Sequence, residues 1–225
     1  HLALALTGNL RPQTVGIVGV GHVGTLVACD LKSSGMRLLL CDPPRKERGE
    51  LCEGQDFTDF PTICREADII TFHSPLPRAG KHATWHLFNE KILDEIGRKP
   101  LIINASRGEV VDTDALLFAL QRNIVRDAVV DTWEHEPDIN RDLLQKAVIA
   151  TPHIAGYSAD GKANATRMVL MKIAEFIGKK FTPNIVLPTS SMLSTDTLRS
   201  DSDLLKSSPS TFETQRGNYP IRREY

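Results

Sequence analysis

The stretch TVGIVGVGHVG at residues 14–24 is the most informative part of this chain. Its first seven residues are apolar or small without alternation, which is typical of a strand buried on both faces of a parallel sheet. Three glycines at the end of this stretch, Gly19, Gly21 and Gly24, have the spacing GxGxxG. Because helical spacing begins directly after them, the pattern predicts a tight turn between a buried strand and a helix.

Each part of this turn has a physical role at a phosphate site. Gly19 permits the turn, Gly21 lets the backbone approach a diphosphate, and Gly24 lets the helix pack closely on the strand. The helix N-terminus at His22 and Val23 presents free N–H groups and a positive dipole end. The sequence therefore predicts a dinucleotide site, and an ordinary glycine-containing turn is the alternative.

Strands and helices alternate along the rest of the chain. Apolar runs predict strands at 14–20, 37–42, 68–73, 101–105, 125–131 and 148–154. Helical spacing predicts helices at 22–34, 58–66, 89–96, 113–122 and 160–178, the first through Val23, Leu26, Val27 and Leu31. Asp112 is expected to cap helix 113–122, with Leu116, Leu117 and Leu120 facing inward. The alternation predicts an α/β fold with a doubly wound parallel sheet.

The composition changes near the C-terminus. Residues 187–211 are rich in serine and threonine and lose periodicity, which predicts a linker or a loosely ordered extension. Aromatic and basic residues return in FETQRGNYPIRREY at 212–225. We therefore expect a dinucleotide-binding domain over residues 1–186 and an extension over residues 187–225.

Charge and cysteine content exclude several classes of function. The net charge is -1 and the pI is near 6.7, which gives no sign of a nucleic-acid or anionic-membrane partner. No apolar run approaches the roughly 20 residues that span a bilayer. The four cysteines form no CxxC pair and have no metal-spaced histidine; they are Cys29, Cys41, Cys52 and Cys64. We expect reduced thiols, a cytoplasmic protein and no metal site.

Asp42 ends the second predicted strand, at the position where a carboxylate binds adenosine ribose hydroxyls. Because a carboxylate repels a 2′-phosphate, Asp42 favours NAD over NADP. Arg45, Lys46 and Arg48 follow and weaken this preference slightly. We expect these three cations to lie in a solvated surface loop.

Two further strand ends carry residues that suit a dinucleotide. Ser74 ends the third predicted strand, along which one half of the cofactor passes. Asp131 ends a later strand, where its carboxylate can bind the nicotinamide carboxamide. A strand-end cap is an equally good interpretation of Asp131.

A cation, a carboxylate and an imidazole follow three later strands, at Arg107, Glu136 and His153. His153 suits the transfer of a hydroxyl proton near neutral pH, and Glu136 can orient and stabilise its imidazolium. Arg107 suits the carboxylate of a 2-hydroxy or 2-oxo acid. Glu134 competes with Glu136 for the carboxylate role. The remaining histidine side chains are expected to be structural or exposed: His22, His73, His82, His86 and His135.

Four motifs resemble the D-2-hydroxyacid dehydrogenase family: GVGHVG, NASRGEVVD, WEHEP and TPHIAGYS. The resemblance covers residues 8–186 and, more weakly, the last fifteen. It implies a Rossmann NAD-binding domain with Arg107, Glu136 and His153 as catalytic residues. Substrate contacts are implied at Arg107 and Tyr157. The cofactor contacts expected from the motifs and the resemblance together are Gly19, Gly21, His22, Val23, Gly24, Asp42, Ser74, Ala105, Ser106, Arg107, Asp131 and Gly156.

The resemblance also implies a substrate and an assembly. The substrate would be a small phosphorylated 2-hydroxy acid, and the intact protein would be a homodimer. The family carries a separate substrate domain before this region, so we expect either that the chain is a fragment or that its start is lost. Residues 187–225 would then be a linker and the remnant of a C-terminal dimerisation extension. Phosphoglycerate, glycerate and hydroxypyruvate remain alternative substrates. An NAD(H)-sensing binding protein on the same fold remains an alternative function.

Overall fold

The computed structural model describes residues 13–156 and 158–185. These residues divide into two units, residues 13–152 and residues 153–185. The first unit holds the sheet and most of the helices, and the second holds one long helix. Tyr157 and the predicted extension at 187–225 lie outside the described residues.

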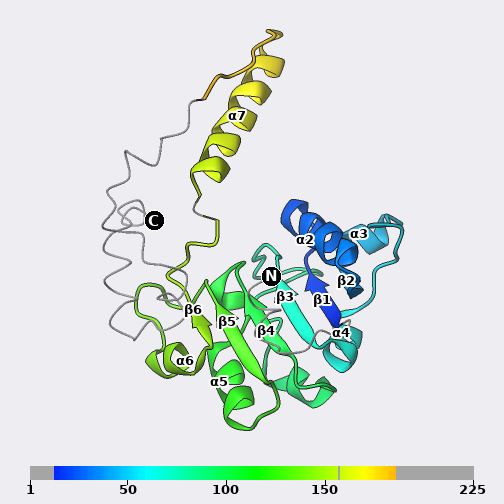
Figure 1. The fold of residues 1–225 in the computed structure, drawn as a ribbon, viewed down its shortest axis with the longest axis vertical. Helices are drawn as coiled ribbons and strands as arrows, with labels where there is room; N and C mark the ends of the chain where they lie inside the picture. The colour runs from blue at the N-terminus through cyan, green and yellow to red at the C-terminus, as the bar shows by residue number, and fades with distance from the viewer. Residues whose placement is uncertain (1–12, 157, 186–225) are drawn as a thin grey trace. The chain divides into compact units, whose positions relative to one another are not determined.

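All strands of the first unit belong to one parallel sheet with the order β2-β1-β3-β4-β5-β6 (Figure 1). Their bounds are Thr14–Val18 for β1, Arg37–Cys41 for β2, Ile69–Phe72 for β3, Leu101–Asn104 for β4, Asp127–Val130 for β5 and Ile149–Ala150 for β6. The predicted doubly wound sheet is therefore confirmed. The strand expected at 148–154 is much shorter, because the chain leaves the sheet at Thr151.

The helices with a long run of periodically spaced apolar residues are those that the sequence predicts. They are α2 (His22–Ser33), α3 (Pro43–Glu47), α4 (Phe60–Glu66), α5 (Thr113–Gln121), α6 (Arg141–Lys146) and α7 (Ala159–Phe176), with a 3₁₀ helix at Glu90–Glu95 where a helix was expected at 89–96. Asp112 caps α5 by accepting the N–H of Ala115 at 3.0 Å, as predicted. The sequence did not predict α3 and α6, which have only five and six residues.

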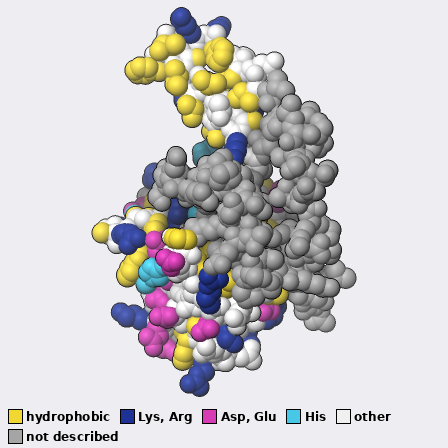
Figure 2. Space-filling view, turned by 90° about the vertical axis from the view of Figure 1, so that its left-hand side faces the viewer, with side chains coloured by type: hydrophobic (Ala, Val, Ile, Leu, Met, Phe, Trp, Pro, Cys, Tyr) yellow, Lys and Arg dark blue, Asp and Glu magenta, His cyan; other side chains and the backbone are white. Residues whose placement is uncertain are grey.

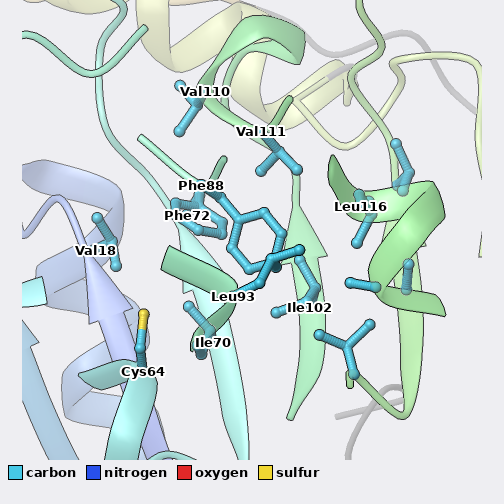
Figure 3. Close-up of a cluster of buried hydrophobic side chains, with 14 of the residues drawn as sticks. Val18, Cys64, Ile70, Phe72, Phe88, Leu93, Ile102, Val110, Val111 and Leu116 are labelled. Carbon is cyan, nitrogen blue, oxygen red and sulfur yellow. The ribbon is translucent and has the colours of Figure 1, made fainter. Parts of the chain in front are cut away.

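Alternate residues of each strand pack into two hydrophobic clusters, one on each face of the sheet. One cluster contains Ile70 and Phe72 of β3, residues of α4 and α5, and Phe88 from the following loop (Figure 3). The rings of Phe72 and Phe88 meet edge to face, with centroids 6.5 Å apart. The other cluster contains Ile69 of β3 together with residues of α2. Burial on both faces explains why the strands are apolar without alternation.

Helix α2 packs on the sheet through its smallest residues. Val23 and Leu26, two of the residues that indicated this helix, are 60% and 67% exposed, whereas Gly24 and Ala28 are buried. A Cβ at position 24 would lie 2.1 Å from the carbonyl oxygen of Gly19. The helix therefore lies too close to the preceding turn for a larger side chain to face it.

The second unit begins at His153 and contains α7. Ser158 caps this helix, since its hydroxyl accepts the N–H of Gly161 at 2.9 Å. Large hydrophobic side chains of α7 are at least half exposed, among them Met168, Val169 and Phe176. Figure 2 shows hydrophobic side chains gathered on the helix at the top of the view.

Candidate functional site

The glycine turn lies where the sheet changes winding direction. β1 pairs with β2 on one side and β3 on the other, so the connections leaving β1 and β2 run in opposite directions. Gly19 follows β1 with φ +85, and a Cβ there would lie 2.6 Å from the Cα of Ser74, which follows β3. Open α/β sheets bind ligands at such a switch point, outside the carboxyl ends of their strands.

The N-terminus of α2 is open to a ligand. Gly21 is its N-cap residue, and no side chain caps the helix in the described part of the chain. A Cβ at position 21 would meet no atom of the described residues within 4 Å, so this glycine does not serve packing against them. Uncapped N–H groups beside a glycine with free space are what a phosphate requires.

Asp42 is held rigidly beside this turn. Its Oδ2 accepts the N–H of Val20 at 2.9 Å, and its Oδ1 accepts the N–H of Arg45 at 3.1 Å. The carboxylate therefore caps α3 and joins the end of β2 to the glycine turn. Each oxygen has a further lone pair, which suits the ribose hydroxyls that the sequence predicts for it.

The expectation of a solvated loop is wrong for Arg45. Its Nη1 donates to the carbonyl of Val20 at 2.6 Å, its Nη2 donates to the carbonyl of Leu51 at 3.3 Å, and its Nε donates to Glu50 at 2.7 Å. The guanidinium also lies 5.2 Å from the ring centroid of Phe57. The side chain is only 21% exposed, because these contacts hold it between the segment after β2 and the glycine turn.

A cleft of about 440 Å³ opens in front of the turn. Its walls are Val20, Gly21, His22, Thr25, Leu26, Arg45, Arg48 and Glu50. Two predicted cofactor residues, Gly21 and His22, thus line a cleft that also carries two cations and a carboxylate. Glu50 was not among the residues predicted for the site.

Ser74 supplies an independent sign of a ligand. Its hydroxyl is buried and finds no hydrogen-bond partner among the described residues. A buried hydroxyl is costly to leave unpaired, and this one lies beside the backbone of Gly19. Next to it, burial lowers the pKa of His73, whose Nε2 lies 3.0 Å from Oγ1 of Thr71. The turn, the open helix end, Asp42 and Ser74 together fit a dinucleotide.

The turn after β4 is organised by Asn104, which the sequence analysis missed. Its amide donates to the carbonyl of Arg107 at 3.0 Å, and its Oδ1 accepts from the N–H and hydroxyl of Ser106 at 3.2 and 2.9 Å. Asn104 is 2% exposed, whereas Arg107 is exposed. The buried amide therefore shapes the backbone from which Arg107 extends, with Ala105 half-buried in the same turn.

Asp131 lies at the end of β5 and is 5% exposed. Its Oδ1 accepts the hydroxyl of Thr151 at 2.6 Å, which ties the ends of β5 and β6 together. This contact agrees with a strand-end role and leaves its other predicted role, at the nicotinamide carboxamide, as a prediction.

The two competing glutamates have different surroundings. Glu134 is buried, with Oε1 2.6 Å from Nε2 of His86 and Oε2 accepting the N–H of Thr113 at 2.7 Å. Glu136 is half-buried, and its Oε1 accepts the N–H of Trp133 at 3.0 Å. Both oxygens of Glu134 are committed to the fold, which favours Glu136 as the carboxylate of the site.

The remaining predicted residues belong to the second unit. His153 is its first residue and has φ +55, and Gly156 is exposed. His153 and Glu136 belong to different units, and the approach of the two side chains stays a prediction. So does the substrate contact of Tyr157, which lies outside the described residues.

The described residues include no cluster of side chains able to hold a metal ion. All four cysteines are free, and Cys41, Cys52 and Cys64 are buried. No helix within residues 13–156 and 158–185 is long and apolar enough to cross a membrane.

Comparison with known families identifies this domain. Residues 3–155 match the family model "D-isomer specific 2-hydroxyacid dehydrogenase, NAD binding domain". Among solved structures, the chain resembles the NAD-complexed D-isomer specific 2-hydroxyacid dehydrogenase of Lactobacillus delbrueckii ssp. bulgaricus. The TM-score is 0.63 and the identity 30%, over 75% of this chain and 55% of that one.

Curated relatives are more similar in sequence. The chain is 50% identical over 96% of its length to erythronate-4-phosphate dehydrogenase of Bacteroides thetaiotaomicron, and 41% identical over 96% to that of Proteus mirabilis. It spans 65% and 63% of the lengths of these two relatives.

Proposed function

Because the chain belongs to the D-isomer specific 2-hydroxyacid dehydrogenase family, with its NAD binding domain over residues 3–155, we propose a function for the complete protein. It is an NAD-dependent erythronate-4-phosphate dehydrogenase. It oxidises 4-phospho-D-erythronate to 2-oxo-3-hydroxy-4-phosphobutanoate in the biosynthesis of pyridoxal 5′-phosphate. The observation that carries this proposal is the 50% identity over 96% of the chain to the Bacteroides enzyme of that name.

The cofactor is held by the switch point of the sheet. The N-terminus of α2 and the free space at Gly21 receive the diphosphate, and Asp42 binds the adenosine ribose. The buried hydroxyl of Ser74 donates to the part of the cofactor that passes β3. Ala105, Ser106, Asp131 and Gly156 complete the predicted contacts, with Asp131 at the nicotinamide carboxamide.

In the reaction, bound NAD+ supplies the acceptor for the hydride that leaves C2 of the hydroxy acid. His153 removes the proton of the C2 hydroxyl, and Glu136 stabilises the resulting imidazolium. Arg107 binds the substrate carboxylate and polarises the carbonyl that forms. Its position depends on Asn104, which shapes the turn before it. Tyr157 contacts the substrate.

We further propose that the intact protein is a cytoplasmic homodimer. Four cysteines that form no disulfide, three of them buried, are ordinary for a protein of a reducing compartment. Dimerisation in this proposal involves the extension that the sequence predicts at 187–225, and it is tested by light scattering of the intact protein at micromolar concentration.

The first test is calorimetric titration of this chain with NAD+. We expect binding that Asp42→Asn weakens, because the amide keeps the size of the carboxylate but donates where the ribose hydroxyls must donate. Asp68→Asn is a matched control, since Asp68 accepts the N–H of Thr14 outside the cleft. Absence of NAD+ binding by the unaltered chain would contradict the proposed site.

The second test is turnover by the complete gene product on a panel of 2-hydroxy acids, followed as NADH formation. We expect the highest kcat/KM with 4-phospho-D-erythronate and loss of turnover in His153→Ala. A preference for phosphoglycerate or glycerate would show that the proposed substrate is wrong, while the family assignment would stand. A protein that binds NAD+ and oxidises none of them, but captures a partner only with NAD(H), would be a sensor.

A further inference from the structure

Glu50 lies in the cofactor cleft between two arginines. Its Oε2 accepts from Nε of Arg45 at 2.7 Å, and its Oε1 accepts from Nε of Arg48. These hydrogen bonds, the one from Arg48 first and that from Arg45 second, lower the pKa of the Glu50 carboxyl. One carboxylate thus forms ion pairs with both guanidinium groups in the wall of the cleft.

The two arginines differ in their freedom. Arg45 is fixed by the carbonyls of Val20 and Leu51 as well as by Glu50. The side chain of Arg48 is 58% exposed, and among the described residues its ion pair is with Glu50. Arg48 is therefore the cation that would be released if the charge of Glu50 were removed.

We propose that Glu50 is a specificity-determining residue that prevents the binding of NADP. This proposal deepens the proposed function, because it concerns which nicotinamide nucleotide the same cleft accepts. Asp42 repels a 2′-phosphate directly, and Glu50 acts in addition by neutralising the cations that would bind that phosphate. The sequence RKERGE at 45–50 looks suited to a phosphate, yet the structure pairs its arginines internally.

The charge of the 2′-phosphate explains why Glu50 should affect the affinity for NADP. A 2′-phosphate monoester carries between one and two negative charges near neutral pH, and it gains most from an unpaired guanidinium. With Glu50 in place, the phosphate would have to compete for Arg48 with a carboxylate already bound to it. A neutral glutamine keeps the shape of the side chain but has one acceptor oxygen instead of two. The fixed guanidinium of Arg45 can retain that oxygen, whereas the NH2 group cannot accept from Arg48, so the competition for Arg48 is removed.

The experiment is a calorimetric titration of the unaltered chain and Glu50→Gln with NAD+ and with NADP+ at low salt. We expect Glu50→Gln to tighten NADP+ binding about tenfold and to change NAD+ binding less than about twofold, since only NADP+ carries the group that Arg48 binds. The gain should shrink as salt is raised, because Arg48 is exposed.

Two further variants test whether the gain in NADP+ affinity comes from the release of Arg48. Glu47→Gln removes one negative charge from the same segment, but Glu47 pairs with Lys81 at 2.8 Å and is not part of the cleft wall, so NADP+ affinity should change less than about twofold. Adding Arg48→Ala to Glu50→Gln should abolish the gain. A folding effect would not be reversed in this way, and a general electrostatic effect would appear equally in Glu47→Gln.

The outcomes separate this inference from the proposed function. If the unaltered chain binds NAD+ and Glu50→Gln binds NADP+ no more tightly, the role given to Glu50 is wrong and the NAD site stands. An equal gain in Glu47→Gln would also overturn it. If the unaltered chain does not bind NAD+, both proposals fail.

Discussion

Nε2 of His86 lies 2.6 Å from Oε1 of Glu134, and Nδ1 of the same ring lies 3.1 Å from Oδ2 of Asp112. The imidazole therefore bridges two carboxylates. The ring also stacks on Trp85, with the two centroids 3.8 Å apart. Because Glu134 also accepts the N–H of Thr113, this arrangement joins the loop after β3 to the start of α5 and to the segment that carries Glu136.

We predict that Glu134→Ala lowers the free energy of unfolding by about 2 kcal/mol, because it removes a buried carboxylate on which half-buried His86 and the N–H of Thr113 both depend. Urea denaturation measures the change. Glu66→Ala is the control, since Glu66 pairs with Arg37 at the surface and should cost less than about 1 kcal/mol. Equal losses in the two variants would show that the His86 bridge contributes no more stability than a surface ion pair.

Two glycines should respond in opposite ways to alanine. Gly21→Ala should change stability by less than about 1 kcal/mol, since a Cβ there meets nothing within 4 Å, but it should weaken NAD+ binding at least about tenfold. Gly108→Ala should destabilise the fold by about 2 kcal/mol or more, because its Cβ would lie 2.0 Å from the carbonyl oxygen of Trp133. Thermal melting and calorimetry measure both effects. Unchanged NAD+ binding in Gly21→Ala would contradict the proposal that the diphosphate binds at this turn.

The Asn104 side chain should matter for both stability and substrate binding. Asn104→Ala leaves the N–H and hydroxyl of Ser106 without their acceptor, and we expect a loss of about 2 kcal/mol in urea denaturation. In the complete protein, the displaced turn at Arg107 should raise KM for the hydroxy acid more than KM for NAD+. A purely structural role would change both KM values equally.

Stability should fall at alkaline pH because of two buried thiols. Burial raises the pKa of Cys41 and of Cys64 from 9.0 to about 12. The folded protein keeps these protons up to about pH 12, whereas the unfolded chain releases them near pH 9, so ionisation favours unfolding between these values. We expect a loss of about 1.4 kcal/mol per thiol at pH 10 relative to pH 8. Urea denaturation of a Cys41→Ala, Cys64→Ala double variant should show a smaller dependence over the same range.

Much of the sheet could be predicted because its strands are buried on both faces and are apolar throughout. Short helices could not, because five or six residues carry too little periodicity for a prediction. Their caps were nevertheless visible in the sequence: Asp42 precedes Pro43 at the start of α3, and Asn140 caps α6. A capping residue before a proline is a usable sign of a helix N-terminus.

At the site, strand ends and glycine spacing placed Gly19, Asp42 and Ser74 correctly at one edge of the sheet. The pairing of side chains between loops could not be predicted, because it depends on backbone paths that local sequence does not specify. Arg45 was therefore expected in solvent, and the partner of Glu134 was not foreseen. Asn104 was missed for the same reason, although a buried polar residue at the end of an apolar strand is a signal of a shaped turn.

The two ends of the sheet have a consequence for self-association. An uncovered strand edge offers free backbone groups to another chain and promotes aggregation. At one end, β6 contains only two residues, and at the other the N–H of Thr58 donates to the carbonyl of Leu40 in β2 at 2.7 Å. Within the described residues, one edge strand is therefore very short and the other is partly covered by the segment at Thr58, and both features limit edge-to-edge pairing with another chain.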